Sequence, residues 1–145
     1  FHNMIGATLS PLDCYLLQRG LKTLHLRIER SQDNARRLAR RCETSDSIDE
    51  VLYSGKTGML SLRLNKAYSV AKFLENLEIC IFAESLGGTE TFITFPYTQT
   101  HVDMPDDEKD KRGIDEHLIR LSIGIEDYKD IEADIIQALT QAKEE

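Results

Sequence analysis

The chain has 145 residues, of which 41% are hydrophobic and 30% are charged, and its formal net charge is −7. These values are typical of one globular domain that buries a sizeable core. The acidic balance argues against a protein that binds nucleic acid or an anionic membrane surface. No apolar run approaches the roughly 18 residues of a transmembrane helix, and no signal-peptide pattern opens the sequence, so we expect neither of these segments.

The first strong signal for secondary structure is Ser10-Pro11, a capping serine followed by a proline at the first helical position. Apolar residues then recur at helical spacing to about Cys42 and predict one long helix with a bend at Gly20. These apolar residues are Leu12, Leu16, Leu17, Leu21, Leu24, Ile28 and Ala35. We expect residues 1–9 to be an extended remnant of an upstream domain and residues 10–145 to form the domain itself.

Arginines gather in the second half of this predicted helix and raise the alternative of a nucleic-acid-binding stripe. They are Arg27, Arg30, Arg36, Arg37, Arg40 and Arg41. Glu29, Asp33 and Glu43 lie among them, which favours the solvated face of an amphipathic helix over a nucleic-acid surface. No nucleic acid is therefore expected as a partner.

Short strands and helices alternate after the long helix. We expect strands over 50–54, 59–64, 79–83, 90–95 and 118–125, the third of them buried, and helices over 66–76, over 105–113 and after the capping residue Asp127. Inward-facing residues of the last helix are expected to be Ile131, Ala133, Ile135, Ile136 and Leu139. The order predicts an α+β domain: a mainly antiparallel sheet with helices on one face, preceded by the long helix.

Several polar motifs do not match a metal or nucleotide site. Cys14, Cys42 and Cys80 lie too far apart for a zinc site and favour reduced, buried thiols. Among the histidines, which show no metal-binding spacing, His101 is the best candidate for a hydrogen-bonding loop residue. Gly55-Lys56-Thr57 imitates the end of a phosphate-binding loop, but the required earlier glycine is absent and a strand follows instead of a helix.

Two polar residues stand out as candidates for chemistry. Arg120 lies inside an apolar strand run, where a guanidinium needs an anion and its flat donor fork suits a carboxylate. The alternative is an arginine at a strand end that pairs with Glu126 or Asp127. Ser85 follows another apolar run and precedes Gly87-Gly88, glycines that let the backbone approach a ligand, although a plain turn is the alternative there.

The sequence resembles the C-terminal part of the pyridoxal-phosphate-dependent enzymes of Cys/Met metabolism, which include cystathionine γ-synthase, cystathionine β-lyase, cystathionine γ-lyase and methionine γ-lyase. The motifs that carry the resemblance are Ser10-Pro11, 19–24, 58–61, 83–88, Thr100-His101 and 118–127. They cover nearly the whole chain in order. The resemblance implies the small C-terminal domain of fold-type I enzymes that use pyridoxal phosphate.

The resemblance also implies roles for three residues. Arg120 would bind the α-carboxylate of a small amino-acid substrate, and Ser85 and Glu84 would line the substrate site. A glutamate at position 84 is common among enzymes of γ-chemistry and favours a γ-synthase, with a β-lyase as the alternative. The short segment between Tyr53 and Gly58 favours a subgroup of the family with a short loop there.

The cofactor side of such an active site is not expected in this chain. In the family, the lysine that bears the cofactor precedes the stretch corresponding to residues 6–11, and no lysine here matches it. The resemblance implies that pyridoxal phosphate is held by an upstream large domain of a cytoplasmic homotetramer. This chain would then contain no catalytic, cofactor-binding or metal-binding residue and would be inactive alone. A stand-alone binding or assembly module derived from the same fold is the other alternative.

Overall fold

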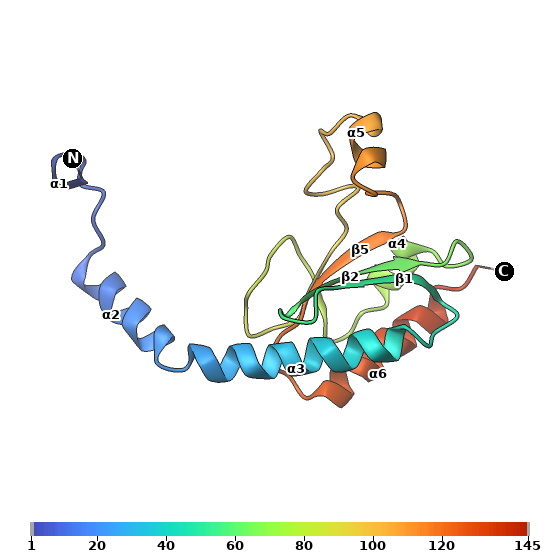
Figure 1. Ribbon diagram of the computed structural model, residues 1–145, viewed down its shortest axis with the longest axis horizontal. Helices are drawn as coiled ribbons and strands as arrows, with labels where there is room; N and C mark the ends of the chain where they lie inside the picture. The colour runs from blue at the N-terminus through green and yellow to red at the C-terminus, as the bar shows by residue number, and fades with distance from the viewer. Residues whose placement is uncertain (1, 145) are drawn as a thin grey trace.

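The computed structural model describes residues 2–144, with side chains from Met4 onward, and shows an α+β body from which an N-terminal helical arm projects (Figure 1). The helices are α1 (His2–Ile5), α2 (Pro11–Leu21), α3 (Leu24–Cys42), α4 (Val70–Glu75), α5 (Asp106–Lys111) and α6 (Tyr128–Gln141). The strands are β1 (Ile48–Tyr53), β2 (Met59–Leu64), β3 (Ile81–Phe82), β4 (Phe92–Thr94) and β5 (Leu118–Ser122). Residues 1 and 145 lie outside this description. The boundary between the predicted remnant at 1–9 and the predicted domain at 10–145 stays a prediction.

The body is built on a five-stranded sheet in the order β1-β2-β5-β4-β3. Every pairing is antiparallel except that of β3 with β4, which is parallel. Helices α3 and α6 lie together against one face of the sheet, and α4 packs on α6 (Figure 1). The predicted α+β class, with a mainly antiparallel sheet and helices on one face, is confirmed.

Alternation along the central strands separates the core from the opposite face of the sheet. The buried cluster between sheet and helices includes Leu60, Leu62, Leu64, Ile93, Ile119 and Leu121 from the strands and Leu38, Ile131 and Ile135 from the helices. The intervening positions of β2, β5 and β4 point away from the helices. Ser61, Arg120 and Thr94 are cross-strand partners there and form one row across the sheet.

The N-terminal arm differs from the single bent helix that the sequence predicts. The helix breaks at Lys22–Thr23, where Thr23 has φ −113° and ψ 6°, and not at Gly20. Ser10 caps α2 as expected and also forms a capping box with Asp13, yet no side chain of α2 is buried. The break is tolerated because the first buried side chain of α3 is Ser31, so packing begins only there. Residues 2–5 are helical where an extended segment was expected.

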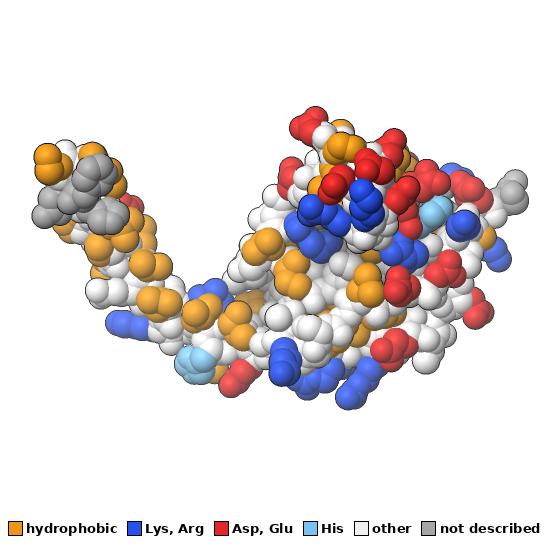
Figure 2. Space-filling view, turned by 45° about the horizontal axis from the view of Figure 1, so that its top comes forward, with side chains coloured by type: hydrophobic (Ala, Val, Ile, Leu, Met, Phe, Trp, Pro, Cys, Tyr) orange, Lys and Arg blue, Asp and Glu red, His pale blue; other side chains and the backbone are white. Residues whose placement is uncertain are grey.

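Apolar side chains run along this arm and onto the start of α3 (Figure 2). The exposed set is Met4, Ile5, Leu9, Leu12, Tyr15, Leu16, Leu17, Leu21, Leu24, Leu26 and Ile28, with Leu12 65% and Leu16 50% exposed. An apolar surface of this kind marks a contact region. Of the apolar residues that the sequence places at helical spacing, only Ala35 is buried, and the other six face solvent within the described chain.

We expect the isolated chain to self-associate through the arm, because association removes this apolar surface from water. Sedimentation velocity should show oligomers that the double substitution Leu12→Glu, Leu16→Glu shifts to monomer. Leu52→Glu, which changes an exposed leucine of β1 outside the arm, is the matched control and should leave the oligomers intact. Monomers of the unmodified chain at every concentration would contradict the prediction.

The predicted buried strand over 79–83 is the largest error in the body. Only Ile81 and Phe82 form a strand, at the sheet edge, and they are 43% and 46% exposed. The cause is Asp134 on α6, whose carboxylate accepts hydrogen bonds from the backbone N–H groups of residues 78–80 at 2.7 to 3.0 Å. These groups are therefore not available for strand pairing.

The last helix departs from the predicted pattern at the same place. Asp127 caps α6 as expected, and Ile131, Ile135 and Leu139 are buried. The predicted inward residues Ala133 and Ile136 are instead exposed. Ala138 and the charged Asp134 are buried instead. Asp134 is buried because the segment 78–80, which packs on α6, presents backbone N–H donors to its carboxylate.

The cysteines are free, and Cys42 and Cys80 are buried, which confirms the prediction for those two, whereas Cys14 is only half-buried. Burial raises the pKa of the Cys42 thiol to about 12. Burial also raises the pKa of Cys80, and the charge and hydrogen bonding of Asp134 add to that effect. Over residues 2–144, no helix combines the length and apolarity that a membrane span requires. No cluster of three or more metal-ligating side chains occurs in the same range.

Candidate functional site

Arg120 lies in the middle of β5 on the sheet face that the helices leave uncovered. Its Nη2 donates to Thr94 Oγ1 at 3.1 Å, and its buried Nε has no hydrogen-bond partner among the described residues. The side chain borders a cavity of about 280 Å3 that is also lined by Leu52, Ser54, Met59, Leu60 and Ser61. A buried guanidinium N–H without a partner is costly, so this arrangement suits an anion that enters the cavity.

Arg63, the other arginine on this sheet face, is a guanidinium whose charge and N–H groups have partners. It pairs with the carboxylates of Glu50 and Asp115 and donates to the carbonyl oxygen of Gly113. Arg120 has no ion pair within the part of the chain that the structure describes. The alternative role for Arg120, a strand-end arginine paired with Glu126 or Asp127, is wrong because those carboxylates bond elsewhere.

Glu84 and Ser85 lie on the exposed loop between β3 and β4. No hydrogen bond joins either of these two side chains to Arg120. The connection is indirect, since the hydroxyl of Thr94 donates to the carbonyl oxygen of Ala83 at 3.1 Å and also accepts the bond from Arg120. The structure thus brings the start of the loop to Arg120 through a residue that sequence reasoning did not single out.

The far end of the same loop is held by a buried polar network. Thr91 donates from its backbone N–H and from Oγ1 to the carboxylate of Glu126, and its Oγ1 accepts from the N–H of Gly124 at 3.0 Å. Asn34 on α3 donates to the carbonyl oxygens of Gly124 and Glu126. A side chain at Gly124 would collide with the carbonyl of Thr89. In the sequence, Gly124 and Glu126 come shortly after the strand that carries Arg120. This position was the signal from which a loop anchor could have been predicted.

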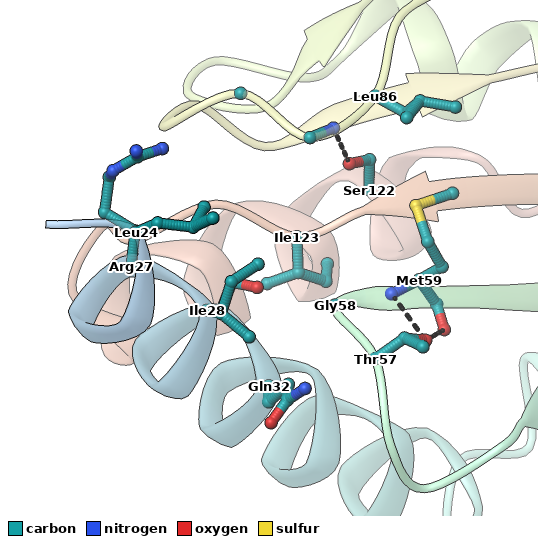
Figure 3. Close-up of a pocket in the computed structure, with 13 residues that line it drawn as sticks. Leu24, Arg27, Ile28, Gln32, Thr57, Gly58, Met59, Leu86, Ser122 and Ile123 are labelled. Atoms are coloured by element: carbon teal, nitrogen blue, oxygen red, sulfur yellow. Dashed lines mark hydrogen bonds between the residues drawn. The ribbon is translucent and has the colours of Figure 1, made fainter. Parts of the chain in front are cut away.

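A second cavity, of about 240 Å3, lies between the first turns of α3 and the loops at 57–59 and 86–88 (Figure 3). Leu24, Ile28 and Ile123 line its apolar wall. Ser122 Oγ accepts from the N–H of Gly87 at 2.9 Å and holds the glycine segment over it. Met59 lines both this cavity and the one beside Arg120, so the two adjoin.

Lysine and histidine side chains are absent from the lining of these two cavities. His101 instead lies on the loop before α5, where its N–H donates to the carbonyl of Pro96 and its ring shares a hydrogen bond with Thr100. The predicted hydrogen-bonding loop role of His101 is confirmed, and it is local to that loop. The described part of the site therefore offers an anion-binding guanidinium and apolar walls, and no lysine for a covalent cofactor link.

Comparisons with known proteins identify the relatives of this chain. A family model described as Cys/Met metabolism PLP-dependent enzyme matches residues 1–140. The chain is 50% identical to a cystathionine gamma-synthase of Haemophilus influenzae over 97% of its length. It is 51% identical to a cystathionine gamma-synthase/O-acetylhomoserine (thiol)-lyase of Bacillus subtilis over 98% of its length. In both cases it spans only 38% of the relative.

The fold is shared with a solved structure from the same group of proteins. The crystal structure of cystathionine gamma-lyase from Lactobacillus plantarum, complexed with L-serine, superposes with a TM-score of 0.88 at 31% identity. The match covers 97% of this chain and 41% of that one. Family model, sequence identity and fold coincide over nearly the whole chain. The chain belongs to the pyridoxal-phosphate-dependent enzymes of Cys/Met metabolism.

Proposed function

We propose that this chain is the C-terminal, substrate-carboxylate-binding domain of a pyridoxal-phosphate-dependent enzyme of the cystathionine γ-synthase type, called here the parent enzyme. The observation that carries the proposal is the buried Nε of Arg120, which has no partner among the described residues. A guanidinium presents parallel N–H groups that match the two oxygens of a carboxylate. The α-carboxylate of an amino-acid substrate would supply the missing partner.

Glu84 and Ser85 are proposed as further residues that line the substrate site. Both are exposed on a loop whose start is anchored to Thr94 of β4 and whose far end is anchored to Gly124, which follows β5. An exposed loop on a rigid support is a common place for side chains that contact a ligand. The loop anchors therefore support a substrate-facing position for these two side chains.

The candidate site does not fit pyridoxal phosphate itself, because no lysine lines the cavity beside Arg120 or the adjoining one. We propose that the rest of the parent enzyme holds the cofactor and that this chain is inactive alone. When bound, pyridoxal phosphate acts as the electron sink for bond cleavage at the substrate Cα. Arg120 would contribute orientation, since a fixed carboxylate determines how the other substituents of Cα are placed.

The γ-synthase type is favoured over the β-lyase alternative by two observations. The relatives that share about half of the residues carry γ-synthase names. The second is what the family resemblance implies, namely that a glutamate at the position of Glu84 is common among enzymes of γ-chemistry. A homo-oligomer in the cytoplasm is proposed for the parent enzyme, supported by the apolar arm and by free cysteines at all three positions.

The test is product analysis of the purified parent enzyme on two substrate sets. With O-acetylhomoserine and cysteine we expect cystathionine and acetate, and with cystathionine alone we expect much slower turnover. The β-lyase alternative instead gives homocysteine, pyruvate and ammonia from cystathionine. The isolated chain is the control and should release none of these products. A parent enzyme that converts neither substrate set would contradict the proposed function.

A further inference from the structure

Thr94, the last residue of β4, joins two parts of the candidate site through one hydroxyl group. Its side chain is 1% exposed and it is the direct cross-strand partner of Arg120. The hydroxyl donates its single proton to the carbonyl oxygen of Ala83 at 3.1 Å and accepts from Arg120 Nη2 at 3.1 Å. Because a hydroxyl has one proton to donate, the bond to Ala83 fixes its oxygen as the acceptor for the guanidinium.

We propose that Thr94 is a positioning residue that sets the orientation of Arg120 relative to the Glu84–Ser85 segment, and thereby the affinity for the substrate α-carboxylate. The inference rests on the proposed function, since it acts through the carboxylate-binding role of Arg120. Arginine has a long side chain with many rotamers, and a single anchor at Nη2 removes much of that freedom. The anchor leaves Nε, which has no partner, to the incoming anion.

The hydroxyl of Thr94 that anchors Arg120 carries no charge, and this property distinguishes a positioning role from ordinary packing. Arg63, on the same sheet face, is held by the carboxylates of Glu50 and Asp115, which compensate its charge. A threonine hydroxyl holds Arg120 in place and leaves its positive charge uncompensated for a ligand. A buried position in a strand is also filled well by valine, so packing alone does not require a hydroxyl there.

The inference is tested in the parent enzyme with Thr94→Val and Thr94→Ser. Thr94→Val keeps the shape and removes the hydroxyl, and we expect it to raise the KM for O-acetylhomoserine about tenfold with kcat changed less than about threefold. The KM for the α-carboxamide of the same substrate, which carries no negative charge, should stay unchanged. Thr94→Ser keeps the hydroxyl and should restore the KM to within about threefold of the unmodified enzyme.

Thr140→Val is the control for the loss of a threonine hydroxyl, because the hydroxyl of Thr140 donates to the carbonyl oxygen of Ile136 on α6 and the residue lines neither cavity of the candidate site. It should leave unchanged the KM ratio, defined as the KM for O-acetylhomoserine divided by the KM for its α-carboxamide. In an Arg120→Ala background, Thr94→Val should add no further loss. If Thr94→Val fails to fold, Thr94→Ala takes its place and is expected to change the same ratio.

The outcomes separate this inference from the proposed function. If Arg120→Ala weakens binding of O-acetylhomoserine and Thr94→Val leaves the KM ratio unchanged, the positioning role is wrong and the proposed function stands. Equal losses for Thr94→Val and Thr94→Ser would likewise overturn the role of the hydroxyl. If Arg120→Ala leaves the KM unchanged, both the inference and the carboxylate-binding role are wrong.

Discussion

Replacing Arg120 by alanine in the parent enzyme is expected to raise the KM for its amino-acid substrate by about 10²- to 10³-fold. The reason is that a buried charge-assisted pair with the substrate carboxylate is lost together with the anchor to Thr94. The cofactor absorbance spectrum should keep its unmodified form, because the chain is proposed to contribute nothing to cofactor binding. Steady-state kinetics beside the absorbance spectrum measures both effects.

Two further variants sharpen this experiment. Arg120→Lys keeps the charge but loses the planar fork, so its KM should fall between those of the alanine variant and the unmodified enzyme. Arg63→Ala is the matched control, because Arg63 lies on the same sheet face with its own carboxylate partners. It should cost stability and leave the KM within about threefold. An Arg120→Ala enzyme with unchanged substrate affinity would refute the carboxylate-binding role.

The second large effect is expected at Asp134, the buried carboxylate that holds the segment before β3. It accepts three backbone N–H groups and the Nε2 of Gln137. Asp134→Ala leaves these donors without their partner and should lower the free energy of unfolding by about 3 kcal/mol. Asp134→Asn keeps the shape but turns an NH2 toward N–H donors, so it should recover little. Urea unfolding of the chain at pH 7 measures both losses.

The contribution of Asp134 should depend on pH with a defined sign. Burial alone would raise the pKa of its carboxyl group, but the hydrogen bonds from Cys80, Glu78, Ile79 and Gln137 outweigh burial and lower the pKa below the ordinary 3.8. A lowered folded-state pKa means that the stabilisation is complete above about pH 4. It is lost as the pH falls through the folded-state value, where the carboxylate becomes protonated.

The stability of the unmodified chain and of Asp134→Asn should therefore converge as the pH falls below about 4. Asp130→Asn, an exposed change on the same helix, is the control and should shift stability by less than about 0.5 kcal/mol. A difference between the unmodified chain and Asp134→Asn that stays constant down to pH 2 would contradict this account.

Local signals predicted much of the fold, because caps and alternation act over a few residues. The capping serine at position 10, the cap at Asp127 and the strand at 59–64 all appear where expected. Arg120 also lies inside a strand of apolar residues as expected, and alternation places it with Leu118 and Ser122 on the face away from the helices. The helix break at Lys22–Thr23 was missed because glycine is only one of several residues that interrupt a helix.

Features that depend on distant partners were not predictable from one sequence. The segment 79–83 looks like a buried strand until Asp134, more than fifty residues later, takes its backbone donors. Thr94 looks like one more residue of an alternating strand. Its importance arises only from the register that places it beside Arg120 and from the fold that brings Ala83 to its other side. Neither relation leaves a local mark in the sequence.

The absence of buried side chains in α2 has a consequence for how the isolated chain loses its structure. Its capping box and backbone hydrogen bonds are local, whereas the body is held by long-range packing that begins at Ser31. In a monomer, the arm and the body are therefore expected to form separate cooperative units. A helical signal such as far-ultraviolet circular dichroism would sum two unequal transitions. Only a probe inside the body, such as hydrogen exchange at Leu121, would report the free energy of the core alone.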